Sequence, residues 1–126
     1  MALVYFDSSA LVKLVLDEPG SDLVASLWNG CDAALSSRLA HPEVCAALSA
    51  SGRRGDLTAS EVRSALADWH EFWASMRQIE LTPAVERSAG DLTHRYGLRG
   101  ADAVHLASAL ALDVADVTVA VWDRRL

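Results

Sequence analysis

Short apolar runs alternate along the chain with stretches whose apolar residues recur at helical spacing. Runs of this kind, or short segments rich in β-forming residues, predict strands at 3–6, 33–36, 78–81 and 117–121. The first and last runs are almost continuously apolar, which is typical of strands buried on both faces of a parallel sheet.

Capping residues and breakers divide the remaining segments into helices. Asp7-Ser8-Ser9 is a capping sequence before an apolar helical pattern that Pro19-Gly20 ends, and Ser21 opens a second helix to about Trp28. A third helix begins at Ser37 or at Pro42. A capping box at 58–61 starts a fourth helix, and the last two are predicted at 83–96 and 100–112. The segment 52–55 is expected to be a loop.

Strands separated by helical connections predict a three-layer α/β/α sandwich with a doubly wound, mostly parallel sheet. The chain has 126 residues, of which 52% are hydrophobic. This length suits one domain with a sizeable core and is short for two. We therefore expect a single domain over residues 1–126.

Four acidic residues occupy positions that such a sheet would bring to one edge. Asp7 closes the first apolar run and Asp123 the last, while Glu43 and Asp102 lie in the first turns of helices. Ligands bind at the carboxyl edge of parallel sheets. Gathered carboxylates repel one another unless a cation lies between them, and hard divalent cations prefer oxygen ligands. The four acids together indicate a Mg²⁺ or Mn²⁺ site, although each alone is equally explained as a helix cap or a solvated turn residue.

The net charge of −6 argues at first against a nucleic-acid partner, because phosphate binding draws on Lys and Arg. Two divalent ions would add +4 and take −6 to −2. Basic residues are also grouped locally, in the pairs Arg53-Arg54 and Arg124-Arg125. Each pair is a candidate for contact with a nucleic-acid backbone or is simply solvated surface. Lys13, the single lysine, is a candidate for substrate contact or is likewise solvated.

Several other classes of protein are disfavoured. No apolar run approaches the roughly 18 residues of a membrane span and no leader pattern opens the chain, so we expect a soluble, cytoplasmic protein with no membrane partner. Cys31 and Cys45 are isolated, which predicts buried thiols rather than a zinc site or a disulfide framework. His41-Pro42-Glu43 lacks the P-C-x-x-C partner of zinc deaminases. His105 is interpreted as a packed core residue rather than a ligand.

The acids lie within four ordered motifs that together resemble those of the PIN-domain family, with a match that runs from end to end. The motifs are DSSALVK at 7–13, SRLAHPEV at 37–44, GADAVHLA at 100–107 and WDRRL at 122–126. Within that family the small single-domain form resembles the VapC toxins of VapBC toxin–antitoxin pairs. One departure is Val121, where relatives often carry Ser or Thr two residues before the last acid.

The resemblance implies a metal-dependent endoribonuclease, a hydrolase that leaves 5′-phosphate and 3′-hydroxyl ends. Asp7, Glu43, Asp102 and Asp123 would be the catalytic, Mg²⁺- or Mn²⁺-binding quartet, with Asp7 and Asp102 as direct ligands and Ser8 as the supporting hydroxyl. Lys13, Arg53, Arg54 and Arg124 are the candidates for RNA contact. The resemblance also implies an RNA substrate, with tRNA as one substrate class, a homodimer, and an antitoxin. The antitoxin would dock in a groove formed by the helices after the first strand and around 69–73. The aromatic residues are interpreted as core rather than as RNA-stacking surfaces; they are Trp28, Trp69, Phe72 and Trp73.

Three alternatives stay open at this stage. A housekeeping PIN nuclease for RNA maturation would use the same acids, but it would be expected to carry an added RNA-binding domain. A catalytically inactive PIN-like binding module is suggested only by Val121. A phosphoacceptor domain also gathers acids at a sheet edge, but it needs a lysine late in the chain, whereas Lys13 is early.

Overall fold

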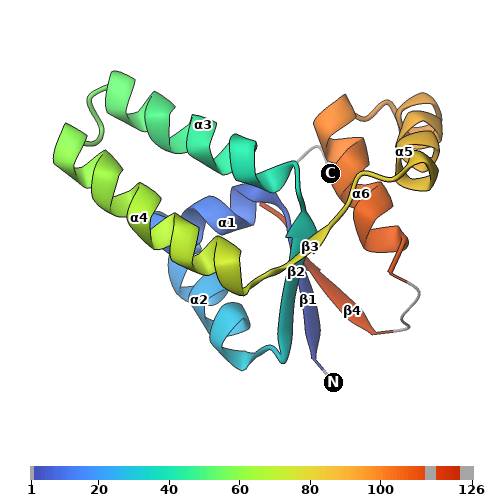
Figure 1. Cartoon of the computed structure of the whole chain (residues 1–126), viewed down its shortest axis with the longest axis horizontal. Coiled ribbons are helices and arrows are strands. Elements are labelled where there is room, and N and C mark those ends of the chain that lie inside the picture. The colour runs from blue at the N-terminus through green and yellow to red at the C-terminus, as the bar shows by residue number, and fades with distance from the viewer. Residues whose placement is uncertain (1, 113–115, 123–126) are drawn as a thin grey trace.

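A computed structural model describes residues 2–112 and 116–122 and shows a central sheet between two groups of helices (Figure 1). The strands are β1 (Leu3–Phe6), β2 (Ala33–Ser37), β3 (Arg77–Ile79) and β4 (Val117–Ala120). The helices are α1 (Ser8–Val15), α2 (Ser21–Gly30), α3 (Ala40–Arg53), α4 (Ala59–Ser75), α5 (Pro83–Tyr96) and α6 (Gly100–Leu110).

The sheet is parallel throughout the part of the chain that the structure describes, in the order β3-β2-β1-β4. Helices α1 to α4 lie on one side of it, and α5 and α6 lie on the other (Figure 1). This arrangement confirms the predicted three-layer α/β/α fold. Because all four strands run the same way, their carboxyl ends meet at one edge of the sheet, where α1, α3 and α6 begin.

Strand β1 is central and its side chains alternate between the two layers, as the pleat of a strand requires. Val4 and Phe6 pack in the core that the sheet shares with α1 to α4. Leu3 and Tyr5 pack in the opposite layer with residues that include Ala109 of α6. A one-residue shift in register would exchange the two sets, so the position of Tyr5 under α6 follows directly from the alternation.

The aromatic residues near the fourth helix belong to the core, as predicted. Trp69 is fully buried, and Trp28, Phe72 and Trp73 are half-buried against the same cluster. The two cysteines differ from expectation, because Cys31 and Cys45 are both half-buried rather than buried. Among the described helices, none is both long enough and apolar enough to cross a membrane.

Several boundaries differ from those predicted, most clearly those of α3 and β3. Helix α3 begins at Ala40, between the two expected starts, and runs through Gly52 and Arg53, so the loop expected at 52–55 is wrong in its first half. A Cβ on Gly52 would lie 2.9 Å from Cγ2 of Val62, so this glycine lets α4 pack closely against the end of α3. Gly55, with φ of 82°, then makes the turn. Strand β3 begins one residue earlier than predicted, at Arg77, and ends two residues earlier, at Ile79.

Candidate active site

Asp7 lies at the carboxyl end of β1, where it caps α1. Its Oδ1 accepts hydrogen bonds from the hydroxyl of Ser9 at 2.7 Å and from the backbone N–H of Ala10 at 3.0 Å. The same Ser9 hydroxyl accepts from the backbone N–H of Trp122 at 3.1 Å, which ties the chain beyond β4 to this site. Only 3% of Asp7 is exposed.

The environment of Asp7 favours its protonated form. Burial raises the pKa of the Asp7 carboxyl above its ordinary value, and the negative charge of Glu43 raises it further, against the hydrogen bonds from Ser9 and Ala10 that lower it. A cation bound nearby would stabilise the ionised form of such a buried carboxyl group.

Glu43, in the first turn of α3, meets His105 of α6. Nε2 of His105 lies 2.6 Å from Oε1 of Glu43. On the other side of the ring, Nδ1 lies 2.7 Å from the hydroxyl of Tyr5. Tyr5 and His105 are both buried, whereas 27% of the Glu43 side chain is exposed. The structure thus joins β1, α6 and α3 through three polar side chains at the carboxyl edge of the sheet.

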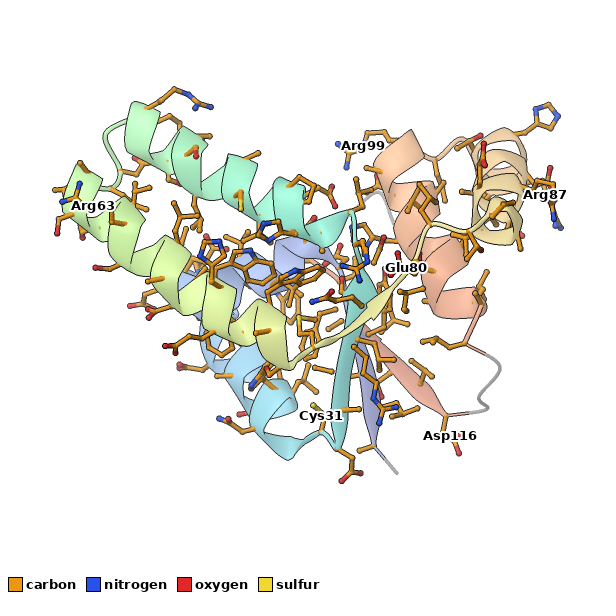
Figure 2. The ribbon with its side chains drawn as sticks, in the orientation of Figure 1. Cys31, Arg63, Glu80, Arg87, Arg99 and Asp116 are labelled. Atoms are coloured by element: carbon orange, nitrogen blue, oxygen red, sulfur yellow. The ribbon has the colours of Figure 1, made fainter. Side chains whose placement is uncertain are left out.

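Asp102 lies one turn before His105, in the first turn of α6. Its Oδ2 accepts a hydrogen bond from Nε of Arg99 at 2.8 Å, and the residue itself is buried. Figure 2 shows Arg99 at the start of α6, at the end of the sheet where α3 also begins. The position also suits a carboxylate because the N-terminal turn of a helix carries partial positive charge.

The donors at this edge fit a hard divalent cation by their chemistry. Asp7, Glu43 and Asp102 offer carboxylate oxygens from β1 and from the first turns of α3 and α6. The pKa of Asp7 is raised mainly by its burial. Across residues 2–112 and 116–122, no three His, Cys, Asp or Glu side chains are spaced so that they could hold a metal ion. Arg99 and His105 each engage one oxygen of this set.

The remaining predicted residues lie in different places. Asp123 and Arg124 are outside the described residues. Val121 lines a mainly apolar cavity of about 270 Å³ beside Asp7 and His105. Ser8 is the first residue of α1, and the hydroxyl that contacts Asp7 is that of its neighbour, Ser9.

The basic candidates for RNA contact are spread over the molecule. The ammonium group of Lys13 lies 3.0 Å from Glu18, donates to the carbonyl of Pro19 at 2.7 Å, and lies 5.7 Å from the centre of the Trp122 ring. Arg53 and Arg54 lie at the far end of α3, about 15 Å along the helix from Glu43. Arg54 pairs with Asp56 at 3.0 Å.

Four residues of this site were not expected from the sequence in the roles that they have here. Ser9, Tyr5 and Arg99 carried no signal of their own, although Arg99 stands three residues before Asp102. His105 also stands three residues from Asp102, and the sequence interpretation placed it in the core without a polar role. It is buried as expected, yet both of its ring nitrogens have hydrogen-bond partners.

The sequence matches a known protein family. The family profile described as "PIN domain" matches residues 4–120. Over 126 residues the chain is 62% identical to Ribonuclease VapC45 of Mycobacterium tuberculosis strain CDC 1551 / Oshkosh and to Ribonuclease VapC49 of strain ATCC 25618 / H37Rv, covering 100% of this chain and 88% of each relative. Ribonuclease VapC46 of the latter strain is 35% identical over the same coverage.

A solved structure is similar in fold. It is the crystal structure of VapC20 of Mycobacterium tuberculosis, described as a sarcin–ricin loop cleaving toxin, and it superposes with a TM-score of 0.67. The match covers 90% of this chain and 86% of that one, with 16% sequence identity. At this identity the likeness concerns the fold.

Proposed function

Since the chain belongs to the PIN-domain family and is a VapC-type member of it, we propose that it is a metal-dependent endoribonuclease and the toxin of a type II toxin–antitoxin pair. The observation that carries this proposal is the position of Asp7, Glu43 and Asp102 at the same edge of a parallel sheet, in a chain 62% identical to proteins named ribonucleases.

We propose that Asp7 and Asp102 bind a Mg²⁺ or Mn²⁺ ion directly. Glu43 and Asp123 would hold a second ion or a water molecule. A bound divalent ion would supply Lewis-acid activation of water and of the scissile phosphate. The chain's own contribution is to hold the oxygens in place: Ser9 and the Ala10 N–H fix Asp7, His105 fixes Glu43, and Arg99 fixes Asp102.

RNA binding would rest on cations near that edge. Arg99 is half-exposed beside Asp102 and Arg124 directly follows Asp123, so both are suited to phosphate contact. Contact by Arg53 and Arg54 would require an RNA that also reaches the far end of α3. Lys13 would first have to leave Glu18 and Pro19. Transfer RNA is the substrate class that we would test first.

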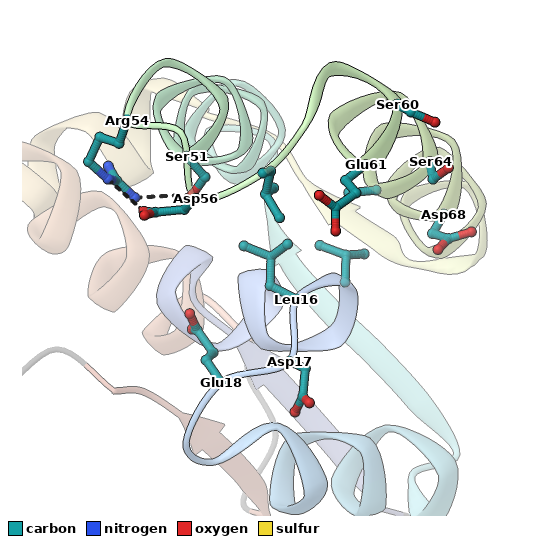
Figure 3. Close-up of a pocket in the computed structure, with 13 residues that line it drawn as sticks. Leu16, Asp17, Glu18, Ser51, Arg54, Asp56, Ser60, Glu61, Ser64 and Asp68 are labelled. Carbon is teal, nitrogen blue, oxygen red and sulfur yellow. Dashed lines mark hydrogen bonds and ion pairs between the residues drawn. The ribbon is translucent and has the colours of Figure 1, made fainter.

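The proposed partner is a cognate antitoxin that docks between α1 and α4. A cavity of about 560 Å³ lies there, with Asp17 and Glu18 on one wall and Glu61 and Asp68 on the other (Figure 3). A neighbouring hollow of about 400 Å³ is lined by residues that include Trp28 and Phe72. An antitoxin segment with apolar residues flanked by Lys or Arg would complement this surface. We also propose a homodimer that acts in the cytoplasm, where its RNA substrate would be found.

The test is cleavage of a total small-RNA pool by purified protein, with Mg²⁺, with Mn²⁺ and with EDTA, followed by sequencing of the fragment ends. We expect discrete cuts that EDTA abolishes and that Asp7→Asn, Glu43→Gln and Asp102→Asn each reduce by at least 100-fold. Asp91→Asn, an exposed acid on α5, is the charge-matched control and should cut normally. Folded wild-type protein that cuts no RNA with either ion would favour a PIN-like binding module instead.

A further inference from the structure

The hydroxyl of Tyr5 is buried among polar groups. The backbone N–H of Ser37, at the end of β2, donates to it at 3.2 Å, and Nδ1 of His105 lies 2.7 Å away. The side chains of Ser36 and Ser108 also lie within reach of it. Burial raises the pKa of Tyr5 far above its ordinary value, so the phenol keeps its proton.

Glu43 determines where one proton of the His105 ring must lie. Nε2 faces Oε1 of Glu43 at 2.6 Å, and a carboxylate oxygen only accepts. An unprotonated Nε2 would set two acceptors against each other at that distance. The contact therefore requires a proton on Nε2, and the Tyr5 hydroxyl holds the other side of the ring at Nδ1.

The chain of hydrogen bonds runs from buried residues to a partly exposed one. Ser37, Tyr5 and His105 are between 1% and 2% exposed, while 27% of the Glu43 side chain is exposed. The first two residues lie on neighbouring parallel strands of the sheet, so the start of the chain is fixed by the backbone. His105 engages one of the two carboxylate oxygens of Glu43.

We propose that Tyr5 and His105 are positioning residues, which hold Glu43 in the orientation needed at the proposed metal site through the Nε2–H group of His105. This proposal rests on the proposed function, because Glu43 is taken as part of the acidic set that receives the ion. Partners that orient metal-binding side chains typically contribute 10- to 100-fold to metal affinity. Tyr5 acts on Glu43 through His105 alone and touches neither the ion nor the RNA.

The tautomer can be read without any metal. Long-range ¹H–¹⁵N NMR of the imidazole ring in the full-length protein, in EDTA, separates the Nε2–H tautomer from the Nδ1–H tautomer and from the doubly protonated ring. We expect Nε2 of His105 to carry a proton in the wild type. A ring protonated on Nδ1 alone would overturn the proposal.

The positioning role is tested with two matched substitutions of the same ring. The side chain of His105→Asn is too short to reach Glu43, whereas the amide nitrogen of His105→Gln can replace Nε2 as a donor. Calorimetric titration with Mn²⁺, without RNA, should show affinity about 10- to 100-fold weaker in His105→Asn and within a few-fold of wild type in His105→Gln. Tyr5→Phe should weaken it by less than His105→Asn. Tyr96→Phe, at an exposed tyrosine, is the control.

The outcomes separate this proposal from the proposed function. Wild-type protein that binds Mn²⁺, together with a folded His105→Asn that binds it equally well, overturns the positioning role and leaves the metal-dependent nuclease standing. Wild-type protein that binds no Mn²⁺ overturns both. If His105→Asn fails to fold by thermal unfolding, Tyr5→Phe takes its place, and Mn²⁺ affinity equal to that of Tyr96→Phe then overturns the proposal.

Discussion

Arg99 and Asp102 form an ion pair across the first turn of α6, with 2.8 Å between Nε and Oδ2. The pair places a positive charge at the edge of the sheet where the acidic residues gather. More than half of the Arg99 side chain is exposed, so solvent weakens its electrostatic effect. At the proposed metal site, Arg99 would therefore compete mildly with the ion for one oxygen of Asp102.

From this competition we expect Arg99→Gln to bind Mn²⁺ about two- to fivefold more tightly than the wild type when RNA is absent, since exposed pairs are worth about 0.2–1 kcal/mol. The gain should shrink at high salt. Calorimetric titration measures it, with Arg87→Gln on α5 as the control (Figure 2). An unchanged or weaker affinity for Mn²⁺ would contradict this account of the ion pair.

Asp7→Asn should make the metal-free protein more stable at neutral pH. The pKa of Asp7 is raised in the folded protein, mainly by burial, so folding disfavours its ionised form. That cost is absent below the unfolded value of 3.8 and is complete above the folded pKa. The gain in Tm from Asp7→Asn should therefore be largest near pH 7.5 and shrink as the pH falls toward 4.

Thermal unfolding in EDTA at several pH values tests this expectation. Asn keeps an oxygen that can cap α1, so loss of the cap does not obscure the result. Asp91→Asn serves as the control for removal of an exposed charge. A gain that grows on acidification, or a loss of stability at neutral pH, would show that burial of the Asp7 charge is not the dominant effect.

His41→Phe should destabilise the packing of α3 against α4. Nε1 of Trp69 donates to Nδ1 of His41 at 3.0 Å, and Trp69 is fully buried. The two rings also stack, at an interplanar angle of 15°. Phe keeps a ring but removes the acceptor, and an unsatisfied buried donor costs about 1–3 kcal/mol. Urea unfolding should show a loss of this size, which His94→Phe, at an exposed histidine, should not produce.

Gly20→Ala and Gly55→Ala form a matched pair, because both glycines have positive φ, of 94° and 82°. Each substitution should cost about 1–2 kcal/mol for the left-handed backbone. A Cβ on Gly20 would also lie 2.7 Å from Nε1 of Trp122, whereas a Cβ on Gly55 would meet nothing within 4 Å. Gly20→Ala should therefore lose more stability than Gly55→Ala in urea unfolding, and it should also change the fluorescence of Trp122. Equal losses would mean that Trp122 moves aside without cost.

Much of the secondary structure follows from local physics and was predictable. The capping box of Thr58 and Glu61 starts α4, as the pattern indicates, because both partners lie within four residues. Thr82 caps α5, and Gly97 ends it with φ of 64°. The end of α3 was missed since Gly52 is helical for a tertiary reason, the close approach of Val62. A glycine that marks a loop and one that admits a neighbouring helix look alike in sequence.

The sequence by itself determined the order of strands and helices and the placement of Asp7, Glu43 and Asp102 at segment ends, because hydrophobic periodicity and capping are local. Only the tertiary structure decided which groups hold these acids. Tyr5 and His105 are 100 residues apart, and their contact depends on the pleat of β1 and on the packing of α6 across the sheet. The choice of Ser9 over Ser8 as the partner of Asp7 likewise depends on where the first turn of α1 directs each hydroxyl. Local sequence patterns do not determine contacts that depend on how separate elements pack together.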